Sequence, residues 1–316
     1  MSVAVRYCAG VATEELTRNV VAAWGQAGAQ WLARLPSILR DVAADWDLTV
    51  GMPYQLSYHY VAAVTCGDGT PAVLKLGVPT ATSLAEEAPA LAAFGGRGAA
   101  RLLRADLARG ALLMERVMPG WRARDLVPHR DSEATSAATE VMRRLHAAPV
   151  PHGMPEALAQ AEAFDGYIAI HRDAGPLPLD LVTRAGGLMR ELCASATERV
   201  VLHGDLHHDN ILRSTREPWL AIDPHGILGD PGYEVGALLF NPDPDNRDQM
   251  LTTLVPARVE QLADELAMPI DRVIAWGFVK AVMSDVWSAE AWSPHADWSP
   301  ASRALDVARL LLPCLT

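Results

Sequence analysis

Residues 200–223 of the 316-residue chain hold the stretch that decides the fold. It begins Val200-Val201-Leu202-His203-Gly204-Asp205-Leu206-His207-His208-Asp209-Asn210-Ile211-Leu212 and continues with Trp219-Leu220-Ala221-Ile222-Asp223. Apolar runs of strand length on both sides of a polar segment with a glycine predict a strand, a tight loop and a further strand. The last run ends in another carboxylate, so we expect acidic and amide side chains to gather at one end of these strands.

The loop reads His203-x-Asp205-x-x-x-x-Asn210, which is the spacing of a kinase catalytic loop. In such a loop the aspartate accepts the proton of the substrate hydroxyl and the asparagine holds a magnesium ion. Asp223 then stands where a kinase places its second metal ligand. Oxygen ligands without a thiolate suit a hard cation such as Mg2+. We therefore predict Asp205 as the catalytic residue, with Asn210 and Asp223 as metal ligands.

Two other interpretations of this stretch are open. An Asp or Asn in a turn commonly bonds to its own backbone, but the internal spacing and the later aspartate favour catalysis. A zinc cluster is the second alternative, with His203, His207, His208 and Asp209 as its ligands. Zinc pairs at this spacing normally lie on one face of a helix, whereas Gly204 and the β-branched flanks favour a loop.

The stretch 203–212 and the segment 219–224 resemble the aminoglycoside phosphotransferase family. Within that family, residues 217–224 and Gly229-Asp230-Pro231-Gly232-Tyr233 are most similar to the streptomycin and hydroxyurea phosphotransferase branch. The similarity is specific over the second half of the chain and weaker over the first. It implies an α+β, two-lobed, protein-kinase-like fold. A small nucleotide-binding lobe with leading helices and an antiparallel sheet would span residues 1–117, and a larger, mostly helical catalytic and acceptor-binding lobe residues 118–316.

Charge and composition narrow the class of partner. The net charge of −11 disfavours nucleic acid and would suit a cationic small molecule. The four cysteines, Cys8, Cys66, Cys193 and Cys314, have no paired spacing, which is typical of a reducing compartment. Neither a signal peptide nor an apolar run of membrane-spanning length is recognisable. We expect a cytoplasmic monomer or dimer without membrane or nucleic-acid partners.

The first third of the chain predicts helices followed by short strands. Helical spacing of apolar residues covers 13–46, with Pro36 as an interruption. Strands are expected over 47–50, 58–64 and 72–76, with turns at Gly51-Met52-Pro53 and at Gly67-Asp68-Gly69. Where kinases carry a glycine-rich phosphate loop, residues 50–57 have a single glycine, so this loop's phosphate contacts stay undefined.

Lys75 lies in a strongly apolar strand, where a charge is costly unless it is paired or faces a ligand. A kinase uses such a lysine to bind nucleotide phosphates. The helix at 83–94 follows and ends at Gly95-Gly96. The resemblance implies a glutamate here that pairs with Lys75, and Glu87 fits better than Glu86. Because Pro89 is awkward inside a helix, a start at Glu86 or Glu87 is an alternative.

The resemblance also implies a hinge after strands at 101–103 and 110–117, where Pro119-Gly120 breaks the second strand. Main-chain groups of Glu115, Arg116 and Val117 would bind the base of ATP or GTP. A plain exit from a strand into a turn is the alternative.

Beyond this point helical patterns dominate. They cover 134–145, an inserted segment up to 196 with Gly186-Gly187 as a weak point, 257–267, 271–287 and 302–312. By resemblance, Asp230 starts a helix and braces the catalytic loop. Aromatic and acidic residues after the penultimate helix suit a lid over a cationic acceptor. We expect Asp285, Trp287 and Glu290 to contact substrate, with Trp292, Asp297 and Trp298 nearby.

These patterns predict a Mg2+-dependent O-phosphotransferase that uses ATP or GTP. By resemblance its acceptor is streptomycin or a related aminoglycoside, with hydroxyurea next. A kinase for a sugar or amino alcohol would share every catalytic residue, and a catalytically silent nucleotide-binding regulator is a further alternative.

Overall fold

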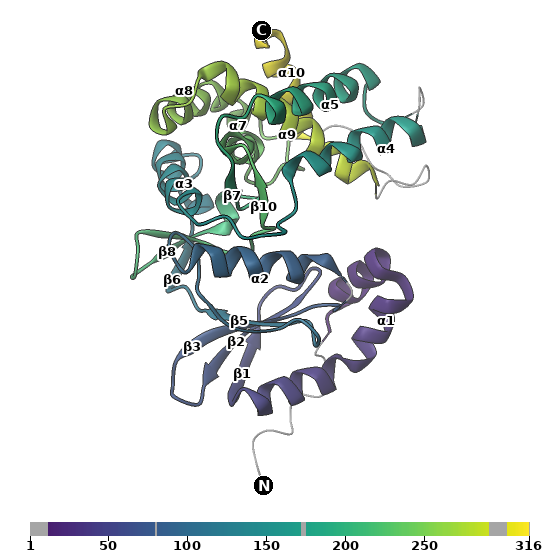
Figure 1. The fold of residues 1–316 in the computed structure, drawn as a ribbon, viewed down its shortest axis with the longest axis vertical. Helices are drawn as coiled ribbons and strands as arrows, with labels where there is room; N and C mark the ends of the chain where they lie inside the picture. The colour runs from purple at the N-terminus through teal and green to yellow at the C-terminus, as the bar shows by residue number, and fades with distance from the viewer. Residues whose placement is uncertain (1–11, 80, 172–174, 291–301, 316) are drawn as a thin grey trace. The chain divides into compact units, whose positions relative to one another are not determined.

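The computed structural model describes residues 12–79, 81–171, 175–290 and 302–315 (Figure 1). Its contacts divide the chain into two compact units. The N-terminal unit contains Met1–Gly96 and Ala100–Val117, and the C-terminal unit contains Arg97–Ala99 and Met118–Thr316. Each unit has its own sheet structure and its own helices.

The N-terminal unit is built on a five-stranded antiparallel sheet with the strand order β1-β2-β3-β5-β4. Its elements in chain order are α1 (Glu14–Asp45), β1 (Leu48–Pro53), β2 (Tyr60–Cys66), β3 (Pro71–Leu76), α2 (Thr82–Phe94), β4 (Leu102–Asp106) and β5 (Ala111–Glu115).

Helices cover both faces of this sheet (Figure 1). Leu74 and Leu76 of β3 pack with Leu16, Val20 and other residues of α1 in one apolar cluster. On the opposite face, Leu112 of β5 packs with the α2 residues Leu84 and Ala88. Side chains alternate between the faces of a strand, so Lys75, which lies between Leu74 and Leu76 and pairs with Leu112, projects toward α2.

The structure corrects three local predictions in this unit. The first helical segment breaks at Gly25, which has φ 51° and ψ −126°, and passes through Pro36 without a break. β1 continues through Gly51-Met52-Pro53, with a register shift against β2, so the turn comes later. α2 begins at Thr82 and holds the exposed Pro89 in its interior, since its buried face packs on the sheet and compensates for one lost backbone bond.

The C-terminal unit is mostly helical. Its main helices are α3 (Asp131–His146), α4 (Glu162–His171), α5 (Leu179–Ala194), α6 (Val235–Phe240), α7 (Gln249–Thr253), α8 (Val255–Leu266), α9 (Ile270–Glu290) and α10 (Arg303–Leu311). α9 packs against α4, α5, α6, α8 and α10 and supplies the centre of the core, including Trp276, Phe278 and Val282. α5 runs through Gly186-Gly187 without interruption.

Two small sheets in this unit hold the loop at 203–210. One pairs β7 (Val200–Leu202) with β10 (Ile227–Gly229), and the other has the order β6-β8-β9, from Pro119–Arg122, Ile211–Ser214 and Trp219–Ala221. β7 enters the loop and β8 leaves it, so the predicted strand, loop and strand are present. The loop closes with one turn of 3-10 helix at His208–Asn210.

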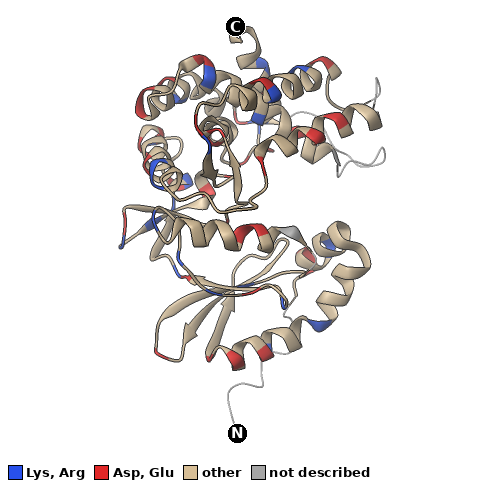
Figure 2. Ribbon diagram, viewed as in Figure 1, with Lys and Arg blue, Asp and Glu red and all other residues tan. Residues whose placement is uncertain are grey.

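Charged residues of both signs are mixed along the described part of the chain. Figure 2 shows acidic and basic positions interspersed along the helices of the C-terminal unit. Within the described residues, no helix combines the length and the apolar character that a membrane crossing needs. Cys66, Cys193 and Cys314 are free thiols.

Gly25 allows a test of how the first helical segment is built. Its backbone lies in a region that L-residues rarely adopt, although a Cβ added at this position would meet no atom within 4 Å. Gly25→Ala should therefore lower the free energy of unfolding by about 1 kcal/mol or more, through backbone strain alone. Urea denaturation followed by circular dichroism measures the change.

The matched control is Gly187→Ala in α5. Its added methyl also meets no atom within 4 Å, and Gly187 lies inside a regular helix. This variant should be more stable by about 0.4–1 kcal/mol, because alanine has less backbone freedom to lose on folding. Equal effects of the two substitutions would contradict the break at Gly25.

Candidate active site

The loop between β7 and β8 is tied to the segment that follows β9. The His225 amide donates to the His203 carbonyl at 2.7 Å, and the Ile222 amide donates to the Asn210 carbonyl at 3.0 Å. These two bonds join the start and the end of the loop to the residues on either side of Asp223. Asn210 and Asp223 are thereby held at the same end of the small sheets.

His203 connects the same two segments through its side chain. Its Nδ1 accepts from the Asp205 amide at 3.3 Å, and its Nε2 lies 2.8 Å from the Ile222 carbonyl oxygen. Both contacts are satisfied by a neutral imidazole with its proton on Nε2. The ring is fully buried, and burial lowers the pKa of His203 to about 4, which keeps it neutral near pH 7.

Asp205 has a partly exposed carboxylate that contacts His207. Its Oδ2 lies 3.5 Å from Nε2 of His207, and the Asp205 side chain is 40% exposed. Desolvation alone would raise the pKa of Asp205. The hydrogen bond from His207 and the electrostatic attraction of His207, His225 and Lys280 outweigh it, so the pKa of Asp205 lies well below its usual value. Asp205 is therefore ionised, as a residue that orients an acceptor hydroxyl must be.

His207, which the sequence suggested only as a zinc ligand, contacts both Asp205 and the backbone of the loop. Its Nδ1 accepts from the Asp209 amide at 3.3 Å, which caps the 3-10 turn. Burial opposes its protonation, but the hydrogen bond with Asp205 and the charges of Asp205, Asp209 and Asp223 raise its pKa above the usual value.

Asn210 is oriented by its amide nitrogen. Nδ2 donates to the backbone carbonyl of Asp205 at 3.0 Å and lies 3.2 Å from Nε2 of His207. The amide oxygen is thus the atom that remains for a cation. Asp223 has φ +63°, which is an unusual conformation for a residue other than glycine. Such backbone conformations cluster at functional sites.

The oxygen donors of Asn210 and Asp223 fit Mg2+. This ion commonly uses one or two protein oxygens and completes its shell with water and phosphate oxygens. Among the described residues, no group of three or more His, Cys, Asp or Glu side chains is arranged to hold a metal. The histidine-rich zinc cluster therefore has no counterpart in the described part of the chain.

Glu234, which the sequence did not single out, braces the loop. Its Oε1 accepts from the Gly204 amide at 3.0 Å, and burial raises the pKa of Glu234 to about 7. Asp230 starts the 3-10 turn Pro231–Glu234, as predicted, by accepting from the Gly232 amide. Its described partners are otherwise Arg272 and Trp276, so the contact to the loop expected of Asp230 is made by Glu234.

Lys75 and Glu87 form a buried ion pair within the N-terminal unit. Nζ of Lys75 lies 2.6 Å from Oε2 of Glu87, and the two side chains are 5% and 2% exposed. Glu87, rather than its neighbour Glu86, is thus the partner of Lys75. β5 ends at Glu115, whose amide donates to the Arg101 carbonyl at 2.8 Å and whose side chain accepts from the Arg101 amide at 3.1 Å, so Glu115 is held where the chain leaves the sheet.

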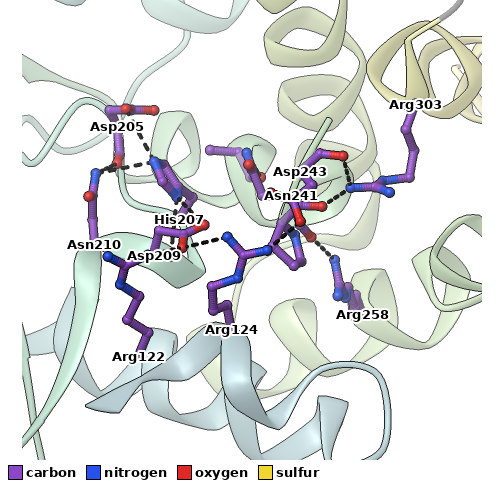
Figure 3. Close-up of polar contacts among 12 residues, drawn as sticks. Arg122, Arg124, Asp205, His207, Asp209, Asn210, Asn241, Asp243, Arg258 and Arg303 are labelled. Atoms are coloured by element: carbon purple, nitrogen blue, oxygen red, sulfur yellow. Dashed lines mark hydrogen bonds and ion pairs between the residues drawn. The ribbon is translucent and has the colours of Figure 1, made fainter. Parts of the chain in front are cut away.

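An ion-pair network surrounds Asp209 (Figure 3). Arg124 donates to Asp209 at 2.9 Å and also to Asp243, and Arg122 lies 3.3 Å from Asp209. Arg258 donates to the Asn241 carbonyl, and Arg303 to the Asp243 carbonyl. These contacts fix the side of the loop that lies away from Asp205.

The residues expected to contact substrate differ in their exposure to solvent. Asp285 is 2% exposed, and both its oxygens accept from the Ser302 hydroxyl, at 2.6 and 2.8 Å. It supports the start of α10 and does not face solvent. Trp287 is 38% exposed. The Glu290 side chain, and all of Trp292, Asp297 and Trp298, lie outside the described residues.

Comparison with solved structures defines the fold class. The choline kinase LicA from Streptococcus pneumoniae matches with a TM-score of 0.61 at 14% identity, over 89% of this chain and 98% of that one. An aminoglycoside phosphotransferase, APH(4)-Ia, matches with a TM-score of 0.59 at 14% identity, over 87% and 98%. The chain therefore has the predicted α+β protein-kinase-like fold of small-molecule kinases.

Sequence comparison identifies the family. The family model of the aminoglycoside/hydroxyurea antibiotic resistance kinases matches residues 51–291. The chain is 30% identical to a streptomycin 6-kinase of Streptomyces glaucescens, over 90% of this chain and 92% of that protein. It is 33% identical to a hydroxyurea phosphotransferase of Kitasatospora aureofaciens, over 84% and 76%. The protein belongs to the aminoglycoside/hydroxyurea antibiotic resistance kinase family and is a nucleotide-using phosphotransferase with an alcohol group as acceptor.

His208 permits a test of the loop's acid sensitivity. Its ring is fully buried, and both ring nitrogens lack a hydrogen-bond partner among the described residues. Burial, together with the charges of Arg258, Arg303 and Arg124, lowers its pKa far below the usual value. Between about pH 6.5 and the lowered pKa, the unfolded chain therefore binds a proton that the folded protein does not.

The free energy of unfolding should thus fall as the pH is lowered below about 6.5, by up to about 1.4 kcal/mol per pH unit for each such histidine. His208→Leu should flatten this dependence. Urea titrations at several pH values between 7 and 4.5 measure it. The exposed His152, changed to Gln, serves as control and should leave the slope unchanged. A wild-type slope in the His208 variant would contradict the assignment of a buried, neutral imidazole.

Proposed function

We propose that the protein transfers the terminal phosphate of ATP or GTP to a hydroxyl of an aminoglycoside of the streptomycin type, with Mg2+ as cofactor. The observation that supports this most is the loop itself. Hydrogen bonds join Asn210 to Asp205 within the loop and tie the loop to the residues next to Asp223. The similarity to streptomycin 6-kinases from two Streptomyces species supports the choice of acceptor.

Asp205 would orient the acceptor hydroxyl. Phosphoryl transfer proceeds through a loose transition state, in which alignment of the attacking oxygen matters more than early removal of its proton. A carboxylate with a lowered pKa is a weak base but remains a hydrogen-bond acceptor. Asp205 would therefore hold the hydroxyl in line and take up its proton late in the reaction.

Asn210 and Asp223 would hold the magnesium ion, which neutralises charge on the phosphate oxygens when bound. Lys75, whose direction is fixed by Glu87, would bind nucleotide phosphates through its ammonium group. Main-chain groups of Glu115, Arg116 and Val117 would bind the nucleotide base. These three roles are independent of the acceptor and apply equally to ATP and GTP.

Hydroxyurea is the second candidate acceptor. A specific observation favours it, because the hydroxyurea phosphotransferase of K. aureofaciens is 33% identical over 277 residues. The net charge of −11 favours a cationic acceptor such as streptomycin over the neutral hydroxyurea. Trp287, which is 38% exposed, is the remaining described candidate for an acceptor contact.

A mass-shift screen separates these acceptors. Purified protein is incubated with ATP or GTP, Mg2+ and either streptomycin, hydroxyurea or a panel of sugars and amino alcohols. We expect a single added phosphate on streptomycin. Phosphorylation of hydroxyurea alone, or of a sugar or amino alcohol alone, would replace the proposed acceptor. No nucleotide consumption with any acceptor would favour a silent nucleotide-binding regulator.

Asp205→Asn tests the role of the carboxylate. The amide keeps the shape of the side chain but cannot accept a proton, so kcat should fall about 100-fold or more while ATP still binds. Steady-state rates and isothermal titration with ATP measure the two properties. Asp271→Asn, at an exposed position at the start of α9, is the matched control and should leave kcat unchanged. Near wild-type turnover by the Asp205 variant would refute this role.

A further inference from the structure

The chain uses lysine at only two positions. Of its 27 Lys and Arg residues, only Lys75 and Lys280 are lysines. Both are buried, with 4% and 3% of their surface exposed. Lysine differs from arginine in carrying a compact ammonium group whose pKa responds to its surroundings. Lys75 has an evident ion-pair partner in Glu87, which leaves Lys280 as the buried lysine whose role is unexplained.

Lys280 projects from α9 toward the catalytic loop. Its Nζ donates to the carbonyl oxygen of Gly204, the residue before Asp205, at 3.3 Å. Gly236 makes room for this side chain, since a Cβ at that position would lie 2.4 Å from Cβ of Lys280. Gly236 thus lets α6 approach α9 closely beside Lys280.

Gly204 is consequently held at both of its backbone groups. Oε1 of Glu234 accepts from its amide, and Nζ of Lys280 donates to its carbonyl. Gly204 has φ +89°, which glycine adopts readily because it has no Cβ. No side chain of its own therefore restrains its backbone. Because the Gly204 carbonyl and the Asp205 amide share one peptide plane, the lysine fixes the orientation from which the Asp205 side chain projects.

Aromatic rings hold the ammonium group in this position. Nζ lies 3.9 Å from the centroid of the Tyr233 ring and 5.2 Å from that of Trp287. Such cation–π contacts stabilise a charge that has lost its water. The acids near this ammonium are Asp205 and Glu234, and burial outweighs their attraction, which lowers the pKa of Lys280 to about 8.

A buried cation with a purely structural role would be expected to have several hydrogen-bond acceptors. Arg303, which is also fully buried, donates to four backbone carbonyls, those of Phe240, Pro242, Asp243 and Asn246. Lys280 has one hydrogen-bond acceptor among the described residues, the carbonyl beside the catalytic aspartate. Its lowered pKa means that the folded protein holds this charge at a net free-energy cost.

We propose that Lys280 is a positioning residue for phosphoryl transfer, which acts by holding the Gly204 carbonyl so that the Asp205 carboxylate faces the acceptor hydroxyl. This inference rests on the proposed role of Asp205. It assigns a function to α9, whose buried apolar residues form core packing, and it gives Tyr233 and Trp287 the role of an aromatic cage for a cation of the protein itself.

Lys280→Met tests the proposal with a side chain of similar length and no charge. With ATP and streptomycin, or hydroxyurea if that is the acceptor, kcat should fall about 10- to 100-fold, because a misaligned catalytic group loses about this much. KM for ATP should stay within a factor of about two. The melting temperature near pH 7 should be unchanged or higher, since a buried charge has been removed.

The pH profile supplies a readout that packing alone would not change. Wild-type kcat should decline above about pH 8, as Lys280 loses its proton. Lys280→Met should lack this decline. Glu234→Gln keeps an oxygen for the Gly204 amide but removes one of the two acids that favour the charged lysine, so the decline should move to lower pH. This second variant retains Lys280 and tests the proposal even if Lys280→Met does not fold.

Val282→Ala is the matched control, since it removes a buried apolar group from the same helix. It should lower the melting temperature and leave kcat and the pH profile unchanged. A folded Lys280→Met with wild-type kcat, or an unshifted profile in Glu234→Gln, would overturn the inference. If Asp205→Asn is inactive in the same assay, only the role of Lys280 fails, whereas an active Asp205→Asn means that the proposed function fails.

Discussion

The geometry of the loop at 203–210 depends on one buried, neutral imidazole. His203 accepts from the Asp205 amide with one nitrogen and bonds to the Ile222 carbonyl with the other. Only a neutral ring with a single proton satisfies both contacts, and a ring without exposed surface has no water to replace either. The side chain therefore joins the residue that would orient the acceptor to the strand that delivers Asp223. The low pKa imposed by burial makes this link insensitive to pH around neutrality.

Each of the two units contains buried charges. An unpaired ion in a protein interior is costly, and a buried ion pair adds little net stability compared with apolar packing, so such groups are better explained by specificity than by stability. The ion pair with Glu87 fixes the direction of the Lys75 side chain on β3. Arg258 pairs with Asp131 and also caps α6 through the carbonyls of Leu238 and Asn241. Each of these groups restricts the fold to one arrangement near functional residues.

The sequence predicts the parts of this protein that depend on short-range patterns. Strand, loop and strand at 200–214 and the hairpin into β3 follow from spacing over a few residues, whereas the choice of Glu87 follows from the family resemblance. Errors occur where packing or backbone geometry overrides local preference. Pro36 and Pro89 lie inside helices because the buried faces of those helices compensate for a lost backbone hydrogen bond. Gly25 interrupts the first helical segment through an unusual φ, which the spacing of apolar residues cannot reveal. Long-range partners could not be predicted at all.

Asp285 was expected to contact substrate as part of an acidic lid, yet its carboxylate is buried against Ser302. Glu234 and Lys280 reach Gly204 from positions 30 and 76 residues away in the chain. One signal for Lys280 was present in the sequence, namely the near absence of lysine from a chain rich in arginine.

The backbone of Asp223 shows how the fold supports an unfavourable conformation. A positive φ costs a residue with a Cβ about 1–2 kcal/mol, and Asp223 adopts φ +63°. Hydrogen bonds on both sides restrain it, from the Ile222 amide to the Asn210 carbonyl and from the His225 amide to the His203 carbonyl. Both acceptors belong to the loop at 203–210. Strain at Asp223 and order in the loop are therefore coupled, because relaxing the first would require breaking the bonds that hold the second. A site of this kind is organised before any ligand arrives, which is the condition under which fixed charges contribute most to catalysis.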